Sequence, residues 1–319
     1  MTQTVLLDRD TLDIGDLDLS ALENLSGGFH SYAQTAPADA ASRIGNARIV
    51  IVNKVLLSAE TLSQCPNLAL ICVIATGVNN IDIDTAKRQG IQVVNCQGYG
   101  TASVSQHVLT LMLALSNSLD PYVQAVRAGR WEQAPHFCFL DYPITELAGR
   151  TLLIVGHGEL GSAVGALAQA LGMDVLISER PGASSTRPGR VAFSNAIEQA
   201  DVVTLHCPLT EQTRDLIDAQ VLERMPSNAL LINTARGGIV NEQDLANALR
   251  NGDIAGAGID VLSEEPPRNG NPLLAKDIPN LLLTPHCAWG SRTARQRIVE
   301  QAVENIKAWQ ADTPVRVVV

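Results

Sequence analysis

A glycine-rich turn near the middle of the chain follows an apolar run and precedes a helical pattern. The turn spans residues 156–161 and reads GHGELG, directly after the apolar residues 152–155. In this context the first glycine permits a tight turn, the second lets the backbone approach a pyrophosphate, and the third lets the helix pack on the strand. The positive end of the helix then faces the phosphates. The pattern predicts cofactor contacts at Gly156, Gly158, Glu159, Leu160 and Gly161.

An acidic residue ends the next apolar run and bears on the choice of cofactor. Glu179 stands there, followed by Arg180. A carboxylate at this position can accept both hydroxyl groups of an adenosine ribose and would repel a 2′-phosphate. Arg180 acts in the opposite direction, because a guanidinium can bind such a phosphate. We expect NAD rather than NADP, with a merely solvated Glu179 as the alternative.

Two further polar residues follow apolar runs and could handle an anionic substrate. Arg236 comes after the run 230–233, and His286 comes after the run 281–284 and a proline. In open α/β sheets the carboxyl ends of the strands form the edge that binds ligands. A guanidinium there can hold a carboxylate and an adjacent keto oxygen, although Arg236 could instead form a surface salt bridge. The glycines at 237 and 238 suggest a close backbone approach at this point.

A carboxylate beside His286 would complete a proton-transfer site. Bonded to the imidazole, it favours the protonated form, and an imidazolium is the proton donor that ketone reduction requires. Glu264 and Glu265 both precede the histidine, and spacing alone does not choose between them. The arginine, the carboxylate and the histidine together predict hydride transfer to an anionic keto substrate.

The elements that must position these residues are short apolar runs that alternate with helical patterns. Near-continuous apolar runs predict parallel strands that are buried on both faces, so we expect two doubly wound α/β sheets. A helix over residues 103–119 would join them, and the helical pattern over 292–311 could return to cover the first domain. The runs lie at 47–52, 68–75, 91–95, 151–155, 175–178, 202–207, 230–233, 257–261 and 281–284.

Composition excludes several classes of function. The 319 residues suffice for two domains, and 46% apolar with 18% charged residues is typical of a soluble protein. A net charge of −10 without a basic block argues against nucleic acid as a partner. No long uninterrupted apolar stretch and no signal-peptide pattern is visible, so we expect a cytoplasmic protein without a membrane span. The six cysteines are scattered, which favours reduced thiols and predicts no metal site.

Several motifs in a fixed order resemble one enzyme family over essentially the whole chain. They lie at residues 75–82, 99–101, 156–161, 206–210, 233–238, 258–261, 265–266 and 285–286. The chain resembles the NAD-dependent D-isomer-specific 2-hydroxyacid dehydrogenases. The resemblance implies a Rossmann dinucleotide-binding domain at residues 99–286, inserted in a flavodoxin-like substrate domain made of residues 1–98 and 287–319.

The resemblance also implies roles for individual residues. Arg236 would bind substrate, His286 would be the acid/base, and Glu265, just before a proline, would be its partner. The implied cofactor contacts beyond the turn and Glu179 are Arg180, Cys207, Pro208, Thr213, Thr234, Ala235, Arg236, Asp260 on the nicotinamide side, and His286. The implied substrate contacts are Asn53, Lys54, the backbone amides of Thr76, Gly77 and Val78, and the side chains of Arg236, His286 and Trp289.

Within the family, Trp289 is similar to the residue of glycerate dehydrogenases and hydroxypyruvate reductases, as are the segments 53–55 and 140–143. This subgroup implies hydroxypyruvate as substrate, with glyoxylate second. The resemblance to the family as a whole implies a homodimer, with the helix over 103–119 as the contact. Alternatives are a phosphoglycerate or D-lactate type of dehydrogenase, or an NADH-sensing corepressor of the same fold. Glu179 replaces the more usual aspartate, which leaves the cofactor preference less certain than the catalytic residues.

Overall fold

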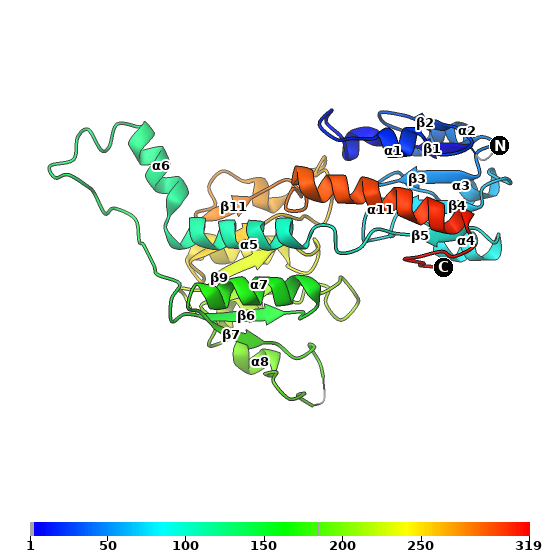
Figure 1. The fold of residues 1–319 in the computed structure, drawn as a ribbon. Helices are drawn as coiled ribbons and strands as arrows, with labels where there is room; N and C mark the ends of the chain where they lie inside the picture. The colour runs from blue at the N-terminus through cyan, green and yellow to red at the C-terminus, as the bar shows by residue number, and fades with distance from the viewer. Residues whose placement is uncertain (1–2, 184) are drawn as a thin grey trace. The chain divides into compact units, whose positions relative to one another are not determined.

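The computed structural model describes residues 3–183 and 185–319, which fall into two compact units (Figure 1). Unit 1 comprises Met1–Gly100 and Gly290–Val319, and unit 2 comprises Thr101–Trp289. The sequence placed the boundaries slightly earlier in the chain, after residues 98 and 286. Trp289 therefore belongs to unit 2, together with Arg236 and His286, whereas Asn53, Lys54 and residues 76–78 belong to unit 1.

Unit 1 is built on a parallel sheet with the strand order β2-β1-β3-β4-β5, which is the flavodoxin-like order. The sequence predicted the last three of these strands. It missed the first two because each has only three residues and β2 is partly exposed, so neither forms a long apolar run. The strands are β1 (Thr4–Leu6), β2 (Phe29–Ser31), β3 (Ile49–Val52), β4 (Leu70–Val73) and β5 (Gln92–Val94).

The helices of unit 1 are short apart from the last one. The C-terminal helix α11 packs against β4 with Ile298, Ala302 and Ile306 buried, so the prediction that it covers the first domain is confirmed. The helices are α1 (Ser20–Glu23), α2 (Ala40–Ile44), α3 (Ala59–Ser63), α4 (Ile83–Arg88) and α11 (Arg292–Gln310), with 3-10 turns at Arg9–Thr11 and Pro37–Asp39.

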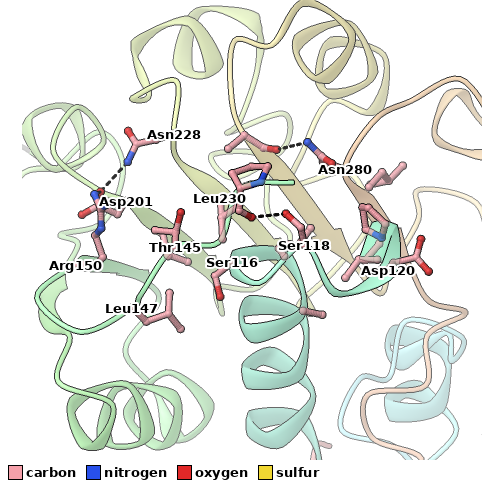
Figure 2. A pocket seen from close by; sticks show the side chains of 18 of the residues that line it. Ser116, Ser118, Asp120, Thr145, Leu147, Arg150, Asp201, Asn228, Leu230 and Asn280 are labelled. Carbon is pink, nitrogen blue, oxygen red and sulfur yellow. Dashed lines mark hydrogen bonds and ion pairs between the residues drawn. The ribbon is translucent and has the colours of Figure 1, made fainter. Parts of the chain in front are cut away.

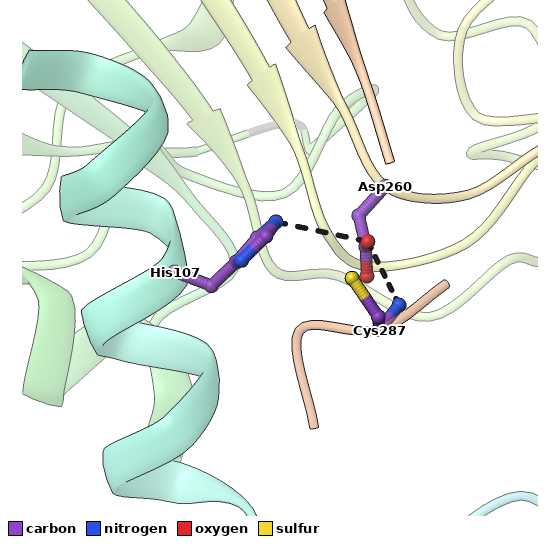
Figure 3. A group of neighbouring side chains, drawn as sticks. All are labelled: His107, Asp260 and Cys287. Atoms are coloured by element: carbon purple, nitrogen blue, oxygen red, sulfur yellow. Dashed lines mark hydrogen bonds and ion pairs between the residues drawn. The ribbon is translucent and has the colours of Figure 1, made fainter. Parts of the chain in front are cut away.

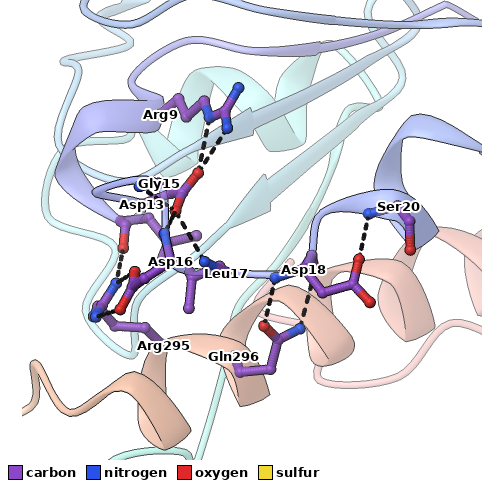
Figure 4. A network of polar contacts seen from close by, with 10 residues as sticks. Arg9, Asp13, Gly15, Asp16, Leu17, Asp18, Ser20, Arg295 and Gln296 are labelled. Carbon is purple, nitrogen blue, oxygen red and sulfur yellow. Dashed lines mark hydrogen bonds and ion pairs between the residues drawn. The ribbon is translucent and has the colours of Figure 1, made fainter.

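A polar network fastens the start of α11 to the segment that follows β1 (Figure 4). Arg295 is buried and donates to both carboxylate oxygens of Asp16, at 2.8 and 2.7 Å, and to the carbonyl oxygen of Leu12 at 3.0 Å. These hydrogen bonds, with the guanidinium charge, hold the pKa of Asp16 below its usual range. One side chain thus joins the two ends of the sequence within unit 1.

Unit 2 is built on a six-stranded parallel sheet with the order β11-β10-β9-β8-β6-β7. The strand order reverses between β6 and β8, which is where a doubly wound sheet opens a crevice for ligands. All six strands correspond to predicted apolar runs, with ends that differ by at most two residues. They are β6 (Thr151–Val155), β7 (Asp174–Ile177), β8 (Val202–Leu205), β9 (Leu230–Asn233), β10 (Gly256–Ile259) and β11 (Leu281–Leu283).

Helices cover both faces of this sheet. Helix α5 packs on α7, β9 and β10 through the buried residues Val108, Leu111 and Met112. It is offset from its predicted range because the chain turns at Ser118, where φ is +47°. The helices are α5 (Thr101–Ser116), α6 (Leu119–Arg127), α7 (Glu159–Ala170), α8 (Phe193–Ala196), α9 (Ala219–Arg224) and α10 (Glu242–Asn251), with a 3-10 turn at Pro272–Leu274. No helix in the described ranges is both long and apolar enough to cross a membrane.

Candidate active site

The glycine-rich turn joins β6 to α7, and its three glycines meet different needs. A Cβ at Gly156, where φ is +98°, would lie 2.6 Å from the backbone nitrogen of Cys207. A Cβ at Gly161 would lie 2.3 Å from the carbonyl oxygen of Gly156. A Cβ at Gly158 would meet nothing within 4 Å. The outer two glycines are therefore required by the packing of the chain itself, whereas the middle one borders open space.

The open space lies at the start of α7. Gly158 is the N-cap of this helix and offers no side-chain acceptor, and the first helical hydrogen bond runs from Ser162 N–H to Gly158 O at 2.9 Å. The amides of Glu159, Leu160 and Gly161 consequently have no acceptor within the helix. Unpaired amides at a helix N-terminus attract an anionic group, and the absence of a side chain at Gly158 leaves room for one.

Buried polar atoms at the ends of β8 and β9 also fit a bound ligand. Within the described part of the chain, His206 Nδ1 and Thr234 Oγ1 are buried and have no hydrogen-bond partner. The other ring nitrogen of His206 pairs with Thr204 Oγ1 at 2.9 Å. Buried polar atoms normally have a hydrogen-bond partner, so atoms without one at the carboxyl edge of the sheet indicate that a polar ligand binds there. The residues present therefore fit a dinucleotide.

The loop after β8 carries three of the predicted cofactor contacts. Thr213 Oγ1 donates to the carbonyl oxygen of Pro208 at 2.7 Å and accepts from the Thr210 amide at 2.7 Å. Thr213 is therefore a residue that shapes this loop. Burial raises the pKa of the Cys207 thiol, so this side chain is a neutral group.

The predicted ribose acid, Glu179, is engaged by its own loop. Its carboxylate accepts from the amides of Arg180 and Arg187, at 2.8 and 3.0 Å, and from Arg187 Nε at 2.8 Å. Arg187 Nη2 adds a further contact. These hydrogen bonds lower the pKa of Glu179, and the residue is only 4% exposed. Arg180 is exposed. The contact between Glu179 and ribose stays a prediction.

The turn after β9 places Arg236 at the carboxyl edge of the sheet. The Asn233 side chain accepts from the Ala235 amide and donates to the Arg236 carbonyl, both at 3.0 Å, which fixes the turn. Arg236 itself is exposed. A Cβ at Gly237 would lie 1.9 Å from the carbonyl oxygen of Leu262. The close approach that the glycines suggested is therefore to the neighbouring loop, at least at Gly237, and not to a ligand.

The geometry chooses the glutamate that spacing left open. His286 Nδ1 lies 2.6 Å from Glu265 Oε2, and the other oxygen of this carboxylate accepts from the Leu262 amide at 2.8 Å. Glu264 instead accepts from the Asn269 side chain at 2.9 Å. Glu265 is therefore the partner of the histidine, and Nε2 is the ring nitrogen of His286 that remains for another group.

A buried carboxylate organises the segment that carries His286. Asp260, 1% exposed at the end of β10, accepts from Thr284 Oγ1 at 2.6 Å and from the amides of Cys287 and Ala288 at 2.9 Å. The His286 amide donates to the carbonyl oxygen of Asp260 at 2.8 Å. His286 has a φ of +51°, a conformation that a non-glycine residue adopts only when its surroundings hold it. The hydrogen bonds between Asp260 and the backbone of residues 286–288 keep His286 in this conformation.

Two neighbours of Asp260 were not expected at the site (Figure 3). His107, on α5, lies with Nε2 3.1 Å from Thr284 Oγ1 and 3.7 Å from an Asp260 oxygen, and Cys287 lies beside them. Nothing in the sequence indicated a role for His107 at the site, because it stands within a long apolar helical pattern. The oxygens of Asp260 already accept three hydrogen bonds, so we assign the group to positioning rather than to a metal.

Trp289 extends the same segment. Its indole Nε1 donates to the carbonyl oxygen of His286 at 2.9 Å, so the ring is fixed relative to the histidine. The bond also occupies the only donor of the indole. Any contribution of Trp289 to substrate choice therefore comes from the shape and apolar faces of its ring.

The predicted substrate residues of unit 1 lie at one edge of its own sheet. Asn53 and Lys54 follow β3, and residues 76–78 follow the adjacent parallel strand β4. The buried carboxylate of Asp8 accepts from the amides of Asn53, Lys54 and Val55 at 2.9, 2.6 and 3.2 Å. The sequence missed Asp8 because it follows β1, which was not predicted.

A hollow of about 200 Å³ in unit 2 is lined by none of these residues (Figure 2). Leu230 and Leu281 line it at the amino ends of β9 and β11, so it lies at the opposite edge of the sheet from His286. Residues of the segments 116–121 and 143–147, which flank α6 and the loop after it, also line the hollow. The hollow therefore belongs to the base of the α6 segment and not to the candidate active site.

Comparison with known proteins identifies the family of the chain. The family model described as "D-isomer specific 2-hydroxyacid dehydrogenase, NAD binding domain" matches residues 109–288. The chain is 43% identical to a glycerate dehydrogenase of Methylorubrum extorquens, over 99% of this chain and 98% of the relative. It is 39% identical to a hydroxypyruvate reductase of Blautia hydrogenotrophica, over 98% of both chains.

A solved structure shows the same fold. The TT0316 protein from Thermus thermophilus has a TM-score of 0.87 and 33% identity, with complete coverage of both chains. The protein thus belongs to the D-isomer-specific 2-hydroxyacid dehydrogenase family and carries its NAD-binding domain.

The buried His206 makes the stability of the fold depend on pH. Burial lowers its pKa to about 4 from the ordinary 6.5, so between these values the unfolded chain binds more protons than the folded one. The free energy of unfolding is therefore highest above pH 6.5, and it falls as the pH is lowered from 6.5 toward about 4. We expect a loss of about 2 kcal/mol between about pH 7 and about pH 5, at ~1.4 kcal/mol per pKa unit.

Urea unfolding of the protein and of His206→Gln at the two pH values measures this term. The advantage of the wild-type protein over the variant should shrink by that amount at the lower pH, because glutamine does not titrate. A difference that stays constant with pH would show that His206 is not held neutral.

Proposed function

We propose that the protein catalyses reversible hydride transfer between NADH and a small 2-keto acid, with hydroxypyruvate as the preferred substrate and glyoxylate as the second. The observation that carries the proposal is the 2.6 Å hydrogen bond between His286 and Glu265 at the carboxyl edge of an NAD-binding sheet. The relatives named glycerate dehydrogenase and hydroxypyruvate reductase support the substrate. The indole of Trp289, fixed beside His286, supports the same subgroup.

The proton is transferred at the Nε2 atom of His286. When bound, NADH supplies the hydride that reduces the keto carbon. His286, protonated on both nitrogens, donates its Nε2 proton to the keto oxygen, which becomes the hydroxyl. Glu265 accepts from Nδ1–H throughout and stabilises the imidazolium before the transfer. In the oxidative direction the neutral ring takes the hydroxyl proton back.

Charge and backbone amides orient the substrate. The planar guanidinium of Arg236 can hold the carboxylate and the keto oxygen together, which polarises the carbonyl. The amides of Thr76, Gly77 and Val78 in unit 1 are the proposed donors to the carboxylate, with Asn53 and Lys54 beside them. The Asp8 carboxylate fixes the backbone of residues 53–55 through three hydrogen bonds, so it positions these contacts.

The cofactor contacts proposed for unit 2 lie along the carboxyl ends of adjacent strands. The amides at the start of α7 would hold the pyrophosphate, and Thr234 and Ala235 would line the nicotinamide side. The unpaired Thr234 Oγ1 and His206 Nδ1 support this placement, since a bound dinucleotide offers them polar partners.

We also propose a homodimer joined through the segment 119–144. The sequence suggested helix α5 as the contact, but α5 is packed within unit 2. The segment after it instead extends away from the sheet of unit 2 (Figure 1) and exposes large apolar side chains. Phe137 is 90% exposed and Leu140 is 76% exposed. Large exposed apolar groups gathered on one extended segment are typical of an interface.

Kinetics of two variants test the catalytic roles. His286→Ala should lower kcat for hydroxypyruvate reduction by a factor of about 100 to 10,000 with little change in KM, because only the proton donor is lost. Arg236→Ala should lower kcat and raise KM together, with kcat/KM falling about a hundredfold or more, because the guanidinium binds substrate and polarises it.

Steady-state NADH oxidation over a panel of hydroxypyruvate, glyoxylate, pyruvate and phosphohydroxypyruvate gives these values and ranks the substrates. His30→Ala and Arg224→Ala, at exposed positions, are the matched controls and should behave as wild type. Near-normal turnover by His286→Ala at neutral pH would refute its role as acid. A preference for another acid of the panel would refute the substrate, and no turnover with any of them would refute the enzymatic proposal.

Sedimentation analysis tests the dimer. The wild-type protein should sediment as a dimer of the 34.0 kDa chain, and the double variant Phe137→Asp/Leu140→Asp should shift it toward the monomer. Ile14→Asp, at an exposed apolar position of unit 1, is the control and should leave the dimer intact. A wild-type monomer, or a double variant that dimerises as well as wild type, would contradict the proposed interface.

A further inference from the structure

The loop that follows β7 holds a charge arrangement that the proposed function does not use. Between residues 178 and 190 the chain carries Glu179, Arg180, Arg187 and Arg190, a surplus of two positive charges. Because β7 is the neighbour of β6, this loop begins beside the phosphate-binding turn at the same edge of the sheet. The charges therefore lie at the end of the site where the adenosine ribose of a dinucleotide would bind.

The acceptor positions of the Glu179 carboxylate are occupied by hydrogen-bond donors of its own loop. Oε1 accepts from the Arg180 amide at 2.8 Å, from Arg187 Nε at 3.1 Å and from Arg187 Nη2. Oε2 accepts from the Arg187 amide at 3.0 Å and from Arg187 Nε at 2.8 Å. A carboxylate offers about four acceptor positions, so none is left for ribose hydroxyl groups in this arrangement.

The pair also changes what the edge of the loop presents to a ligand. The carboxylate is buried and fully paired, whereas the Arg187 side chain is 48% exposed. Arg190 Nη1 donates to the carbonyl oxygen of Ser178 at 3.1 Å, which ties the far end of the loop to the strand. Arg180 is exposed. The loop thus offers guanidinium groups to solvent while its one negative charge is neutralised from within.

We infer that Arg187 is the specificity-determining residue of the ribose end: by pairing with Glu179 it cancels the repulsion of a 2′-phosphate and supplies a guanidinium for it, so the site accepts NADPH as well as NADH. The inference rests on the proposed cofactor site. It assigns Glu179 a different task from the one that the sequence predicted, namely to hold the loop through its amides rather than to bind ribose.

Replacing Arg187 should affect the binding of the two cofactors differently. In Arg187→Met the carboxylate loses its guanidinium, so it repels a 2′-phosphate and gains free acceptors for ribose hydroxyl groups. The Kd for NADPH should rise by about tenfold or more, and the Kd for NADH should stay the same or fall. Arg187→Lys keeps a positive charge and should retain most of the NADPH affinity, which serves as a second variant if the first folds poorly.

Replacing Glu179 tests the other half of the pair. In Glu179→Gln the amide oxygen can still accept from the loop backbone, but the negative charge is gone. NADPH should bind as tightly as in the wild type or more tightly, and the Kd for NADH should change by less than about threefold. A loss of NADH affinity of about tenfold or more would show that the carboxylate binds ribose directly, and it would overturn the inference.

Equilibrium binding measures these effects without turnover. NADH and NADPH are titrated by their fluorescence, and 2′,5′-ADP and 5′-ADP by calorimetry, with Arg224→Met as the control for loss of a surface charge in unit 2. The wild-type Kd values for NADPH and NADH should agree within about tenfold. Binding of NADH and 5′-ADP without NADPH and 2′,5′-ADP would refute the inference alone. Failure of all four to bind would refute the proposed cofactor site itself.

Discussion

The carboxylate of Asp260 is the constraint on which the candidate active site depends. It is buried at the end of β10 and accepts one hydroxyl and two amide hydrogen bonds from residues 284–288. A buried charge is costly unless it is fully hydrogen-bonded, so the segment cannot move away without leaving that charge unpaired. His286 is held inside this segment with a left-handed backbone, and its ring is thereby presented to Glu265.

The other site residues follow from the same edge of the sheet. Strands β9, β10 and β11 are adjacent and parallel, so Arg236, Asp260 and His286 all follow carboxyl ends that meet there. Gly237 packs directly on the backbone of Leu262, whose amide donates to Glu265. The turn that carries Arg236 and the loop that carries Glu265 therefore pack directly against each other. Unit 1 repeats the device on a smaller scale, with Asp8 fixing the backbone of Asn53 and Lys54.

Much of this arrangement could be predicted from the sequence, because long apolar runs and glycine turns carry strong local signals. The six strands of unit 2, the turn at 156–161 and the covering role of α11 were predicted. The short strands β1 and β2 were not, and neither was Asp8, whose importance depends on β1. Side-chain contacts that depend on how the chain folds could not be predicted either. The pairing of Arg187 with Glu179 and the gathering of His107 and Cys287 at Asp260 arise only when the chain is folded.

The central role of Asp260 is tested most directly by the effect of Asp260→Asn on hydroxypyruvate reduction, with NADH affinity measured in parallel. The asparagine places an NH₂ group against the amide of Ala288 or of Cys287, two donors face each other, and the His286 segment must shift. We predict that kcat falls by about a hundredfold or more while the Kd for NADH changes by less than about tenfold. A variant that keeps kcat and loses NADH affinity instead would show that Asp260 serves the cofactor, and it would contradict the claim that this carboxylate positions His286.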